Sequence, residues 1–269
     1  MIKMKLLFST NPYKENAPRL MNELAEYSKS RGIEAASAIG EEELAGLAEA
    51  NADAFCIVTL GGDGTILRAV HTASKHGIPV LGINMGRVGF YSEIGTDGFP
   101  AALDSMLDGS YFIEKRSMLS CSVNGEHIGD CLNDYSIHRQ ELSSIVQLEL
   151  AVDEDEVGGL MADGLVIATP SGSTAYTISA GGPVVAPRLD CILVTPVCPH
   201  TLTVRPIAAS AESAVTVRLK SVCRVSEDGQ NTRILYPDDE LTIRRSERKA
   251  EFIRFEHRNV FKLLREKLL

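Results

Sequence analysis

The chain has 269 residues, of which 44% are hydrophobic, and it carries a formal net charge of −9. That is enough apolar sequence for one large domain or two of ordinary size. No basic block stands out, which argues against a nucleic-acid partner but leaves room for a small phosphorylated ligand, because local fields can oppose the net charge. No apolar run reaches the ~18 residues that a spanning helix needs, so we expect no membrane partner.

The six cysteines, at positions 56, 121, 131, 191, 198 and 223, are scattered and form no Cys-x-x-Cys pair. Several of them lie in apolar runs. This usage predicts reduced, buried thiols of a cytoplasmic protein rather than a disulfide framework or a zinc site. We therefore assign no metal-ligating residues.

The first 95 or so residues alternate between strand and helix patterns. We expect helices at 16–31, 41–50 and 66–76, a further short helix at 98–110, and strands at 3–9, 33–39, 54–60 and 78–84. Such alternation is typical of a Rossmann-like parallel sheet with helices on its faces. In that α/β arrangement ligands bind beyond the carboxyl ends of the strands.

From residue 112 short alternating runs take over, which predicts a mostly-β, sandwich-like second domain. The expected strands are 117–123, 126–138, 145–152, 163–169, 190–195, 213–219, 222–226 and 240–245. The acidic run 153–156 reads as a hairpin tip. Residues 257–269 regain helical spacing, and we expect this helix to pack against the first domain. The predicted division is an α/β domain over 1–100, a β-rich domain over 101–255 and a returning helix over 256–269.

One glycine-rich turn, Gly61-Gly62-Asp63-Gly64-Thr65, follows an apolar strand pattern and precedes a helix. Glycine lets the backbone approach a ligand closely, and a helix N-terminus favours phosphate. A carboxylate beside bound phosphates can take a proton from a hydroxyl or help to hold a metal ion. The alternative is a turn whose Asp63 only caps the helix. Neither Walker A nor the Gly-x-Gly-x-x-Gly fingerprint is present.

A second unusual stretch begins at Asp163-Gly164 and continues through a Ser-, Gly- and Thr-rich run to Tyr176 and Pro183. Small hydroxyl residues and glycine expose backbone N–H groups without bulk, which suits a flat polar ligand. Tyr176 can stack on a base, or it can fill a gap in the core. The alternative for the whole stretch is a loop that caps a helix starting near Thr174.

The pair Asn133-Asp134 lies within a β pattern, although both residues are poor strand formers. An amide and a carboxylate side by side can hold two sugar hydroxyls, since Asp accepts and Asn both donates and accepts. The alternative is a bulge or turn.

Together these motifs resemble the NAD kinase family and stand in the family's order across residues 55–230. The first motif is shared with diacylglycerol and sphingosine kinases, whereas the 163–183 stretch is far more specific to NAD kinases. The matching pieces are Gly61–Thr65, Leu81–Phe90, Asn133-Asp134, Asp163–Pro183, Thr195-Pro196 with Pro199-His200, and Asp228–Gln230.

The resemblance implies an N-terminal α/β domain, a β-sandwich-like C-terminal domain, and a homodimer or homotetramer. It also implies a reaction, the transfer of the terminal phosphoryl of ATP, or of polyphosphate, to the 2′-hydroxyl of the adenosine ribose of NAD, which gives NADP. Mg²⁺ or another divalent metal would accompany ATP and offset its charge.

Residue roles are carried over from the same resemblance. Asp63 would be the base or orienting group, and Gly61, Gly62, Gly64 and Thr65 would bind phosphate. The residues assigned to NAD are Asp63, Gly64, Arg68, Asn133, Asp134, Met161, Asp163, Thr174, Ala175, Tyr176, Thr177, Ile178, Ser179, Cys198, Asp228 and Gln230. The chain departs from the family at Met161, where a basic residue is common, and at Asp134, where Glu is also common.

Two other functions stay open at this point. A lipid or sphingoid kinase of the wider superfamily would need an apolar cleft, and the polar 171–176 stretch argues against it. A non-catalytic dinucleotide sensor is the other alternative, and the intact Asp63 argues against that.

Overall fold

The computed structural model describes residues 4–86, 89–141, 143–200, 204–257 and 259–268. The chain forms two compact units, unit 1 (residues 1–115 and 249–269) and unit 2 (residues 116–248). The chain passes from one unit to the other inside two long strands, β6 (Phe112–Val123) and β17 (Glu240–Arg254). The two units divide between residues 115 and 116 and between residues 248 and 249, whereas the sequence analysis placed the divisions near residues 100 and 255. Nothing in the pattern of a continuous strand marks the point where it leaves a unit.

Unit 1 is built on a parallel sheet with the order β2-β1-β3-β4, and the short strand β5 pairs with β4. The registers place Thr10 beside Leu60, and Gly61 beside Asn84, so the carboxyl ends of β1, β3 and β4 lie at one edge. The strand bounds are β1 Lys5–Thr10, β2 Glu34–Ile39, β3 Cys56–Gly61, β4 Val80–Asn84 and β5 Ile94–Gly95.

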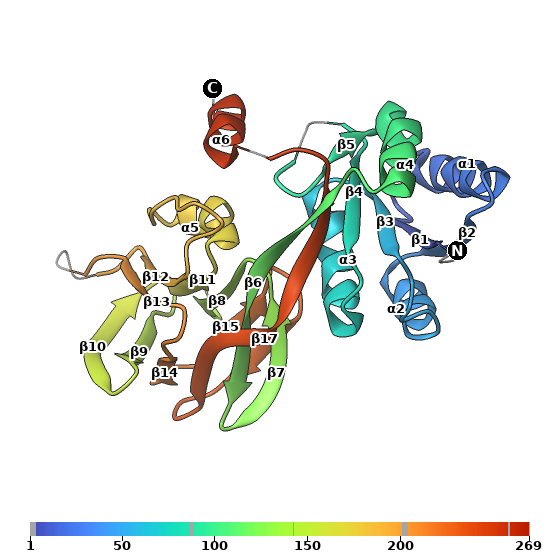
Figure 1. The fold of residues 1–269 in the computed structure, drawn as a ribbon. Coiled ribbons are helices and arrows are strands. Elements are labelled where there is room, and N and C mark those ends of the chain that lie inside the picture. The colour runs from blue at the N-terminus through green and yellow to red at the C-terminus, as the bar shows by residue number, and fades with distance from the viewer. Residues whose placement is uncertain (1–3, 87–88, 142, 201–203, 258, 269) are drawn as a thin grey trace. The chain divides into compact units, whose positions relative to one another are not determined.

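Helices cover both faces of this sheet, with α1 and α4 on one side and α2 and α3 on the other (Figure 1). Every residue of β3 is buried, as is usual for a central parallel strand. Phe8 of β1 meets Phe99 of α4 edge to face, with 5.8 Å between ring centroids. The helix bounds are α1 Ala17–Ser30, α2 Glu41–Glu49, α3 Asp63–His76 and α4 Phe99–Asp108.

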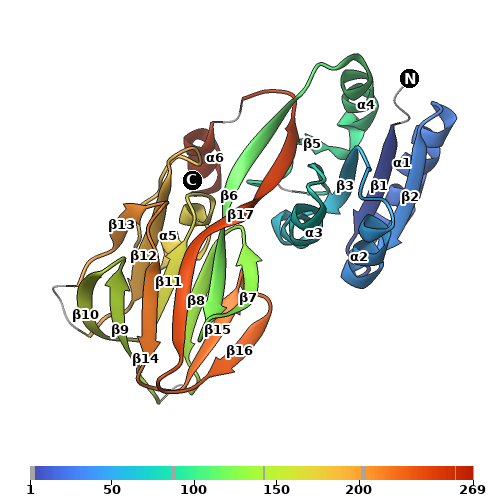
Figure 2. The same ribbon diagram turned by 60° about the horizontal axis from the view of Figure 1, so that its bottom comes forward.

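Unit 2 consists of antiparallel strands in two layers (Figure 2). One layer has the order β10-β9-β14-β17, with β6 beside β17 and β7 beside β6; the other has the order β13-β12-β11-β8-β15-β16. The remaining bounds are β7 Glu126–Cys131, β8 Asp134–Arg139, β9 Val146–Val152, β10 Asp155–Ala162, β11 Gly164–Ala168, β12 Cys191–Val197, β13 Ile207–Ser210, β14 Val215–Leu219, β15 Cys223–Glu227 and β16 Thr232–Leu235.

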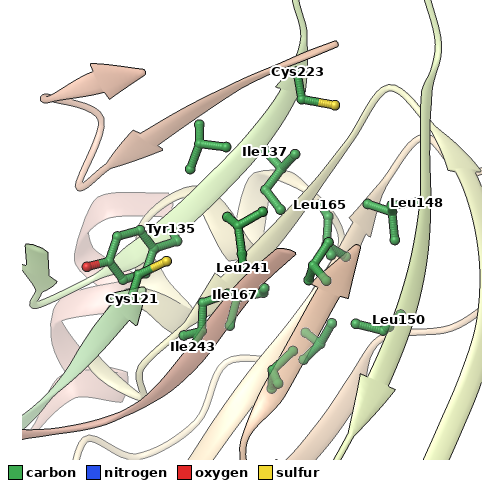
Figure 3. Packing of buried hydrophobic residues seen from close by; sticks show 14 of the residues in the cluster. Cys121, Tyr135, Ile137, Leu148, Leu150, Leu165, Ile167, Cys223, Leu241 and Ile243 are labelled. Atoms are coloured by element: carbon green, nitrogen blue, oxygen red, sulfur yellow. The ribbon is translucent and has the colours of Figure 1, made fainter. Parts of the chain in front are cut away.

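The core of unit 2 is formed by side chains that point inward from both layers (Figure 3). Ile137 and Leu165 come from one sheet, and Leu148 and Leu241 come from the other. Two antiparallel sheets that interdigitate in this way form a β-sandwich. The predicted fold class, a parallel α/β domain followed by a mostly-β domain, is therefore confirmed.

Several elements differ from the prediction. The predicted strand 126–138 is two strands, β7 and β8, and the predicted strand 240–245 is the much longer β17. Strands β10, β13 and β16 had no counterpart in the prediction, because their charged or small residues do not alternate clearly. The hairpin tip turns at Asp153, which has φ 54°, and β10 already starts at Asp155.

The C-terminal helix exists as α6 (Val260–Leu268), and Phe261 on it is 56% exposed. Its packing against the first domain stays a prediction. Predicted positions 3, 87, 88, 258 and 269 lie outside the described residues. Within the described part of the chain, no helix is both long enough and apolar enough to cross a bilayer.

Candidate active site

Asp63 is the first residue of α3, three residues earlier than the predicted helix start at 66. Gly62 precedes it in an extended conformation, and the carbonyl of Gly62 accepts the N–H groups of Thr65 and Ile66. A negative charge in the first turn of a helix is favourable. The early start therefore places the carboxylate of Asp63 at the helix N-terminus, next to the carboxyl end of β3.

Both carboxylate oxygens of Asp63 accept backbone hydrogen bonds from a distant segment. Phe90 N donates to Oδ2 at 3.0 Å, and Tyr91 N donates to Oδ1 at 3.1 Å. A Cβ on Gly89 would overlap Oδ1, so only glycine fits there. A carboxylate oxygen can accept more than one hydrogen bond. Asp63 is thus held by the protein rather than left to rotate.

The glycines of this turn fall into two kinds. A Cβ on Gly61 would lie 2.5 Å from Thr65 Cβ, so packing explains that glycine. A Cβ on Gly62 or Gly64 would meet nothing within 4 Å, and neither residue has a positive φ. Packing and backbone strain therefore do not require glycine at 62 or 64. The open space at both positions suits close approach of a ligand to the backbone.

A pocket of about 290 Å³ opens beside this turn, at the carboxyl end of β1. The predicted residues Thr65 and Arg68 line it, which places a hydroxyl and a cation beside the helix N-terminus. Its other lining residues are Ser9, Thr10, Asn11, Pro12, Tyr13, Gly40, Glu41, Leu44 and Ala69. The position at the carboxyl end of a parallel strand is one where ligands bind, and Arg68 and Glu41 bring one charge of each sign to the pocket.

In unit 2 the carboxylate of Asp228 organises the break between β7 and β8. Oδ2 accepts Leu132 N at 2.8 Å, while Oδ1 accepts Asn133 N at 2.7 Å and Asp134 N at 3.0 Å. Asp228 itself has φ 50°, a left-handed conformation that Asp tolerates. Three N–H groups that a continuous strand would use in its ladder are thus taken by one side chain. This is why the predicted strand 126–138 is interrupted at Asn133.

The Ser-, Gly- and Thr-rich stretch folds directly onto this break. Thr169 Oγ1 donates to Leu132 O and accepts Gly172 N, while Thr169 N donates to Asn133 O. A Cβ on Gly172 would overlap the carbonyl of Asn133. The stretch then forms two short turns of helix, Ser171–Thr174 and α5 (Tyr176–Ser179). The alternative of a capping loop is correct in that a short helix begins near Thr174, but neither helix has a side-chain cap hydrogen bond.

These segments enclose a pocket of about 410 Å³ within unit 2. Five of its lining residues were predicted from the sequence, namely Asn133, Asp134, Ala175, Tyr176 and Asp228. Six were missed, namely Ser136, His138, Arg224, Ser226, Gly229 and Thr232. A signal for four of them was present, because strand residues two apart share a face: Ser136 and His138 follow Asp134, and Arg224 and Ser226 precede Asp228.

Tyr176 forms one wall of this pocket, and its ring lies 5.4 Å from that of His138. The pKa of Tyr176 is raised, first by burial and then by the charges of Cys198, Asp134 and Asp163. The pKa of His138 is lowered, first by burial and then by the nearby Arg224. Two neutral aromatic rings beside hydroxyl and carboxyl groups suit a nucleoside, which needs stacking and hydrogen bonds together.

Asp134 is 4% exposed, and burial, followed by the charge of Asp228, raises its pKa from 3.8 to about 7. The backbone N–H of Tyr176 donates to this carboxyl group and opposes part of the rise. A group with a raised pKa keeps its proton in the folded protein after the unfolded chain has released it. The protonated Asp134 therefore contributes to the unfolding free energy below about pH 4, and this contribution is lost as the pH rises towards 7.

This linkage gives a testable prediction for Asp134→Asn, which resembles the protonated carboxyl group and does not titrate. Between about pH 5 and pH 8, the wild type should lose about 2–3 kcal/mol of unfolding free energy relative to the variant, at 1.36 kcal/mol per pKa unit. Urea unfolding of both proteins at the two pH values measures the difference. The same pH dependence in both proteins would contradict the raised pKa.

The other predicted NAD-binding residues of unit 2 do not line this pocket. Asp163 pairs with Arg139 Nη1 at 3.0 Å, so a cation does reach this position although Met161 supplies none. Met161 is 45% exposed. The prediction of buried thiols is wrong at Cys198, which is exposed, and at Cys191, which is only partly buried. The predicted residues outside the pocket lining are Met161, Asp163, Thr174, Thr177, Ile178, Ser179, Cys198 and Gln230, of which Thr177 is fully buried.

In the described part of the chain, no three His, Cys, Asp or Glu side chains gather so as to hold a metal ion by themselves. Mg²⁺ is commonly bound by one or two carboxylates together with substrate phosphates. The single carboxylate of Asp63, beside the glycine turn, is compatible with that way of binding.

Known protein families match both parts of the chain. Residues 9–111 match the model of the ATP-NAD kinase N-terminal domain, and residues 132–255 match that of the ATP-NAD kinase C-terminal domain. The NAD kinase of Methanothermobacter thermautotrophicus is 39% identical over 264 residues, which cover 94% of this chain and 92% of that relative. The NAD kinase of Geobacter sulfurreducens is 42% identical over 218 residues, covering 78% and 77%.

Solved structures agree with these matches. An NAD kinase from Archaeoglobus fulgidus in complex with ATP aligns with a TM-score of 0.77 at 28% identity, covering 97% of this chain and 98% of that one. Yeast NADH kinase complexed with NADH shares the fold, with a TM-score of 0.86 at 24% identity, covering 98% and 87%. Because both domain models match and the sequence similarity to known NAD kinases extends over most of the chain, the chain belongs to the NAD kinase family.

Proposed function

We propose that the protein transfers the terminal phosphoryl group of ATP to the 2′-hydroxyl of the adenosine ribose of NAD. Asp63 accepts the proton of that hydroxyl, or orients it, as the new P–O bond forms and the bond to ADP breaks. The unit 2 pocket around Asn133 and Tyr176 binds the adenosine part of NAD. The membership of the NAD kinase family supports this reaction, and the held carboxylate of Asp63 is the observation that carries the mechanism.

ATP, or polyphosphate in its place, binds at the glycine turn, where Gly62 and Gly64 leave the backbone open to phosphate. The neighbouring pocket with Thr65 and Arg68 adds a hydroxyl and a cation. Mg²⁺ or another divalent ion bound to the nucleotide neutralises charge on the transferred group. Phosphoryl transfer depends mainly on such positioning and charge neutralisation, so the chain needs few reacting groups of its own.

The direct test is an assay of the purified protein with ATP, Mg²⁺ and NAD, in which an NADP-specific dehydrogenase reports product. Formation of NADP that requires all three components is expected. Polyphosphate and NADH in parallel arms define the donor and the redox form of the acceptor. Diacylglycerol and sphingosine serve as controls, and phosphorylation of either lipid without NADP formation would contradict the proposal.

The open glycines give a second prediction. Gly64→Ala should leave the melting temperature unchanged or slightly higher, because alanine is a better helix residue and its Cβ meets nothing in the protein. If phosphate approaches the backbone here, the KM for ATP or NAD should rise about tenfold, roughly 1.4 kcal/mol of lost binding. Gly46→Ala on α2, also with open space around it, is the control and should leave both KM values unchanged. Unaltered KM values in Gly64→Ala would contradict the role.

We further propose that the protein works in the cytoplasm as a homodimer or homotetramer. All six cysteines are free thiols, which is usual in a reducing compartment. The family resemblance supports the oligomer, and light scattering coupled to size exclusion measures it.

A further inference from the structure

We propose that Arg254, near the end of β17, is a positioning residue that fixes Asp63 through residues 89–93, here called the 89–93 loop. This inference rests on the proposed function of Asp63. Asp63 contacts one side of the loop and Arg254 contacts another, although the two residues are 191 positions apart in the sequence.

The 89–93 loop is the structure that holds the carboxylate of Asp63. Phe90 N and Tyr91 N both donate to it, and Gly89 packs against it. The loop has further internal support, since Gly89 N donates to the hydroxyl of Ser92. A movement of Phe90 or Tyr91 would therefore alter the hydrogen bonds that hold the oxygens of Asp63.

Arg254 holds the same loop from β17. Its Nη1 donates to Tyr91 O at 3.2 Å and to Glu93 Oε2 at 2.9 Å, and its Nε donates to Glu114 Oε2 at 2.7 Å. The guanidinium lies 4.9 Å from the centre of the Phe252 ring, and that ring stacks on Tyr91. Tyr91 is thus fixed by its carbonyl and by its ring on the Arg254 side, and by its N–H on the Asp63 side.

Glu93 completes the arrangement and ties the loop to two strands. Glu93 N donates to Gly82 O of β4 at 2.7 Å, while its Oε1 accepts Phe255 N at 2.9 Å. The side chains of Arg254 and Glu93 are each only 2% exposed, and that of Glu114 is 28% exposed. A guanidinium can bond a carbonyl and two carboxylates in one plane, whereas a lysine offers a point charge without that fork.

Apolar side chains could fill the space of Arg254, Glu93 and Glu114, but they could not make the same hydrogen bonds. Glu93 and Glu114 both face the guanidinium of Arg254, and burying charged groups is costly unless they are well bonded. Apolar residues of the same volume would give comparable stability, but none could bond Tyr91 O. What the arginine adds is a defined position for that carbonyl.

The test uses Arg254→Lys, which keeps the charge between the two glutamates but cannot make all three contacts. Hydrogen exchange of the 89–93 amides is the first readout, because it reports the loop independently of catalysis. We expect exchange there to become at least about tenfold faster, with exchange in β1 and β3 unchanged. We also expect kcat to fall about 10–100-fold while both KM values change less than about threefold, as for a misplaced catalytic group.

Glu114→Gln is the milder second variant, because its side chain is partly exposed and the amide keeps an acceptor for Nε. It should shift exchange and kcat in the same direction by a smaller factor, and it tests the inference by itself if Arg254→Lys does not fold. Arg248→Met is the matched control, since Arg248 lies on the same strand but pairs with Asp130 of unit 2. It should leave exchange in the 89–93 loop and kcat at wild-type values.

Unchanged exchange in the 89–93 loop, or exchange that rises equally throughout unit 1, would overturn the inference, because Arg254 would then be a general structural residue. Faster loop exchange with a wild-type kcat would overturn it as well. A wild type that makes no NADP defeats the proposed function instead. In that case the exchange experiment still reports whether Arg254 holds the loop.

Discussion

Asp63→Asn is expected to lower kcat by about 10²–10⁴-fold, the usual contribution of a general base, while the Kd for NAD changes little. The amide cannot accept a proton from the ribose hydroxyl. It also turns an NH₂ group towards Phe90 N or Tyr91 N, so one of the two backbone hydrogen bonds is lost. Coupled NADP detection measures kcat, and titration calorimetry measures the Kd for NAD.

A loss of about 1–3 kcal/mol in unfolding free energy should accompany the change at Asp63, because a backbone N–H group is left without its acceptor. The control is Asp153→Asn, since Asp153 also accepts a backbone N–H, from Ala214, at a hairpin of unit 2. That variant should keep its kcat. Near-normal turnover of Asp63→Asn would rule out a role for the carboxylate in catalysis.

Gly89→Ala should be almost as damaging, although the residue carries no reactive group. Its Cβ would overlap Oδ1 of Asp63, so either the carboxylate or the 89–93 loop must move. A displacement of about 1 Å at a reacting group can reduce the rate about 10²-fold. We expect a fall in kcat of that order, with binding of NAD retained, in the same coupled assay.

Gly95→Ala is the matched control for this prediction. Gly95 follows on the same stretch of chain, but its Cβ would meet nothing within 4 Å. The control should therefore keep both stability and kcat. If Gly89→Ala turned over NAD as fast as Gly95→Ala, contact with the loop would not fix the position of Asp63.

Local pattern predicted most of the elements of unit 1. Strands β1 to β4 and helices α1 to α4 all have a predicted counterpart. The spacing of apolar residues and a glycine after the last helical residue are signals that a short stretch of sequence contains by itself. The start of α3 was placed late at residue 66. The reason is that Asp63 and Gly64 look like turn residues, whereas Gly62 acts as the N-cap and Asp63 is already helical.

The contacts that make the site depend on residues far apart in sequence, and no local pattern contains them. Asp228 interrupts a strand 95 residues upstream by taking the N–H of Asn133. Asp63 is held by Phe90 and Tyr91, and Tyr91 is held by Arg254. The glycine turn indicated Asp63 and the resemblance to a family added Asp228, but only the fold shows that backbone N–H groups donate to both carboxylates.

A crystal structure of this protein with bound NAD would test the proposed role of Asp63 without relying on any variant. The proposed mechanism predicts that the 2′-hydroxyl of the adenosine ribose lies within about 2.6–3.2 Å of a carboxylate oxygen of Asp63, as a proton acceptor requires. Asp63 should still accept Phe90 N and Tyr91 N in that complex. An adenosine ribose bound away from Asp63, or a different hydroxyl facing it, would contradict the mechanism.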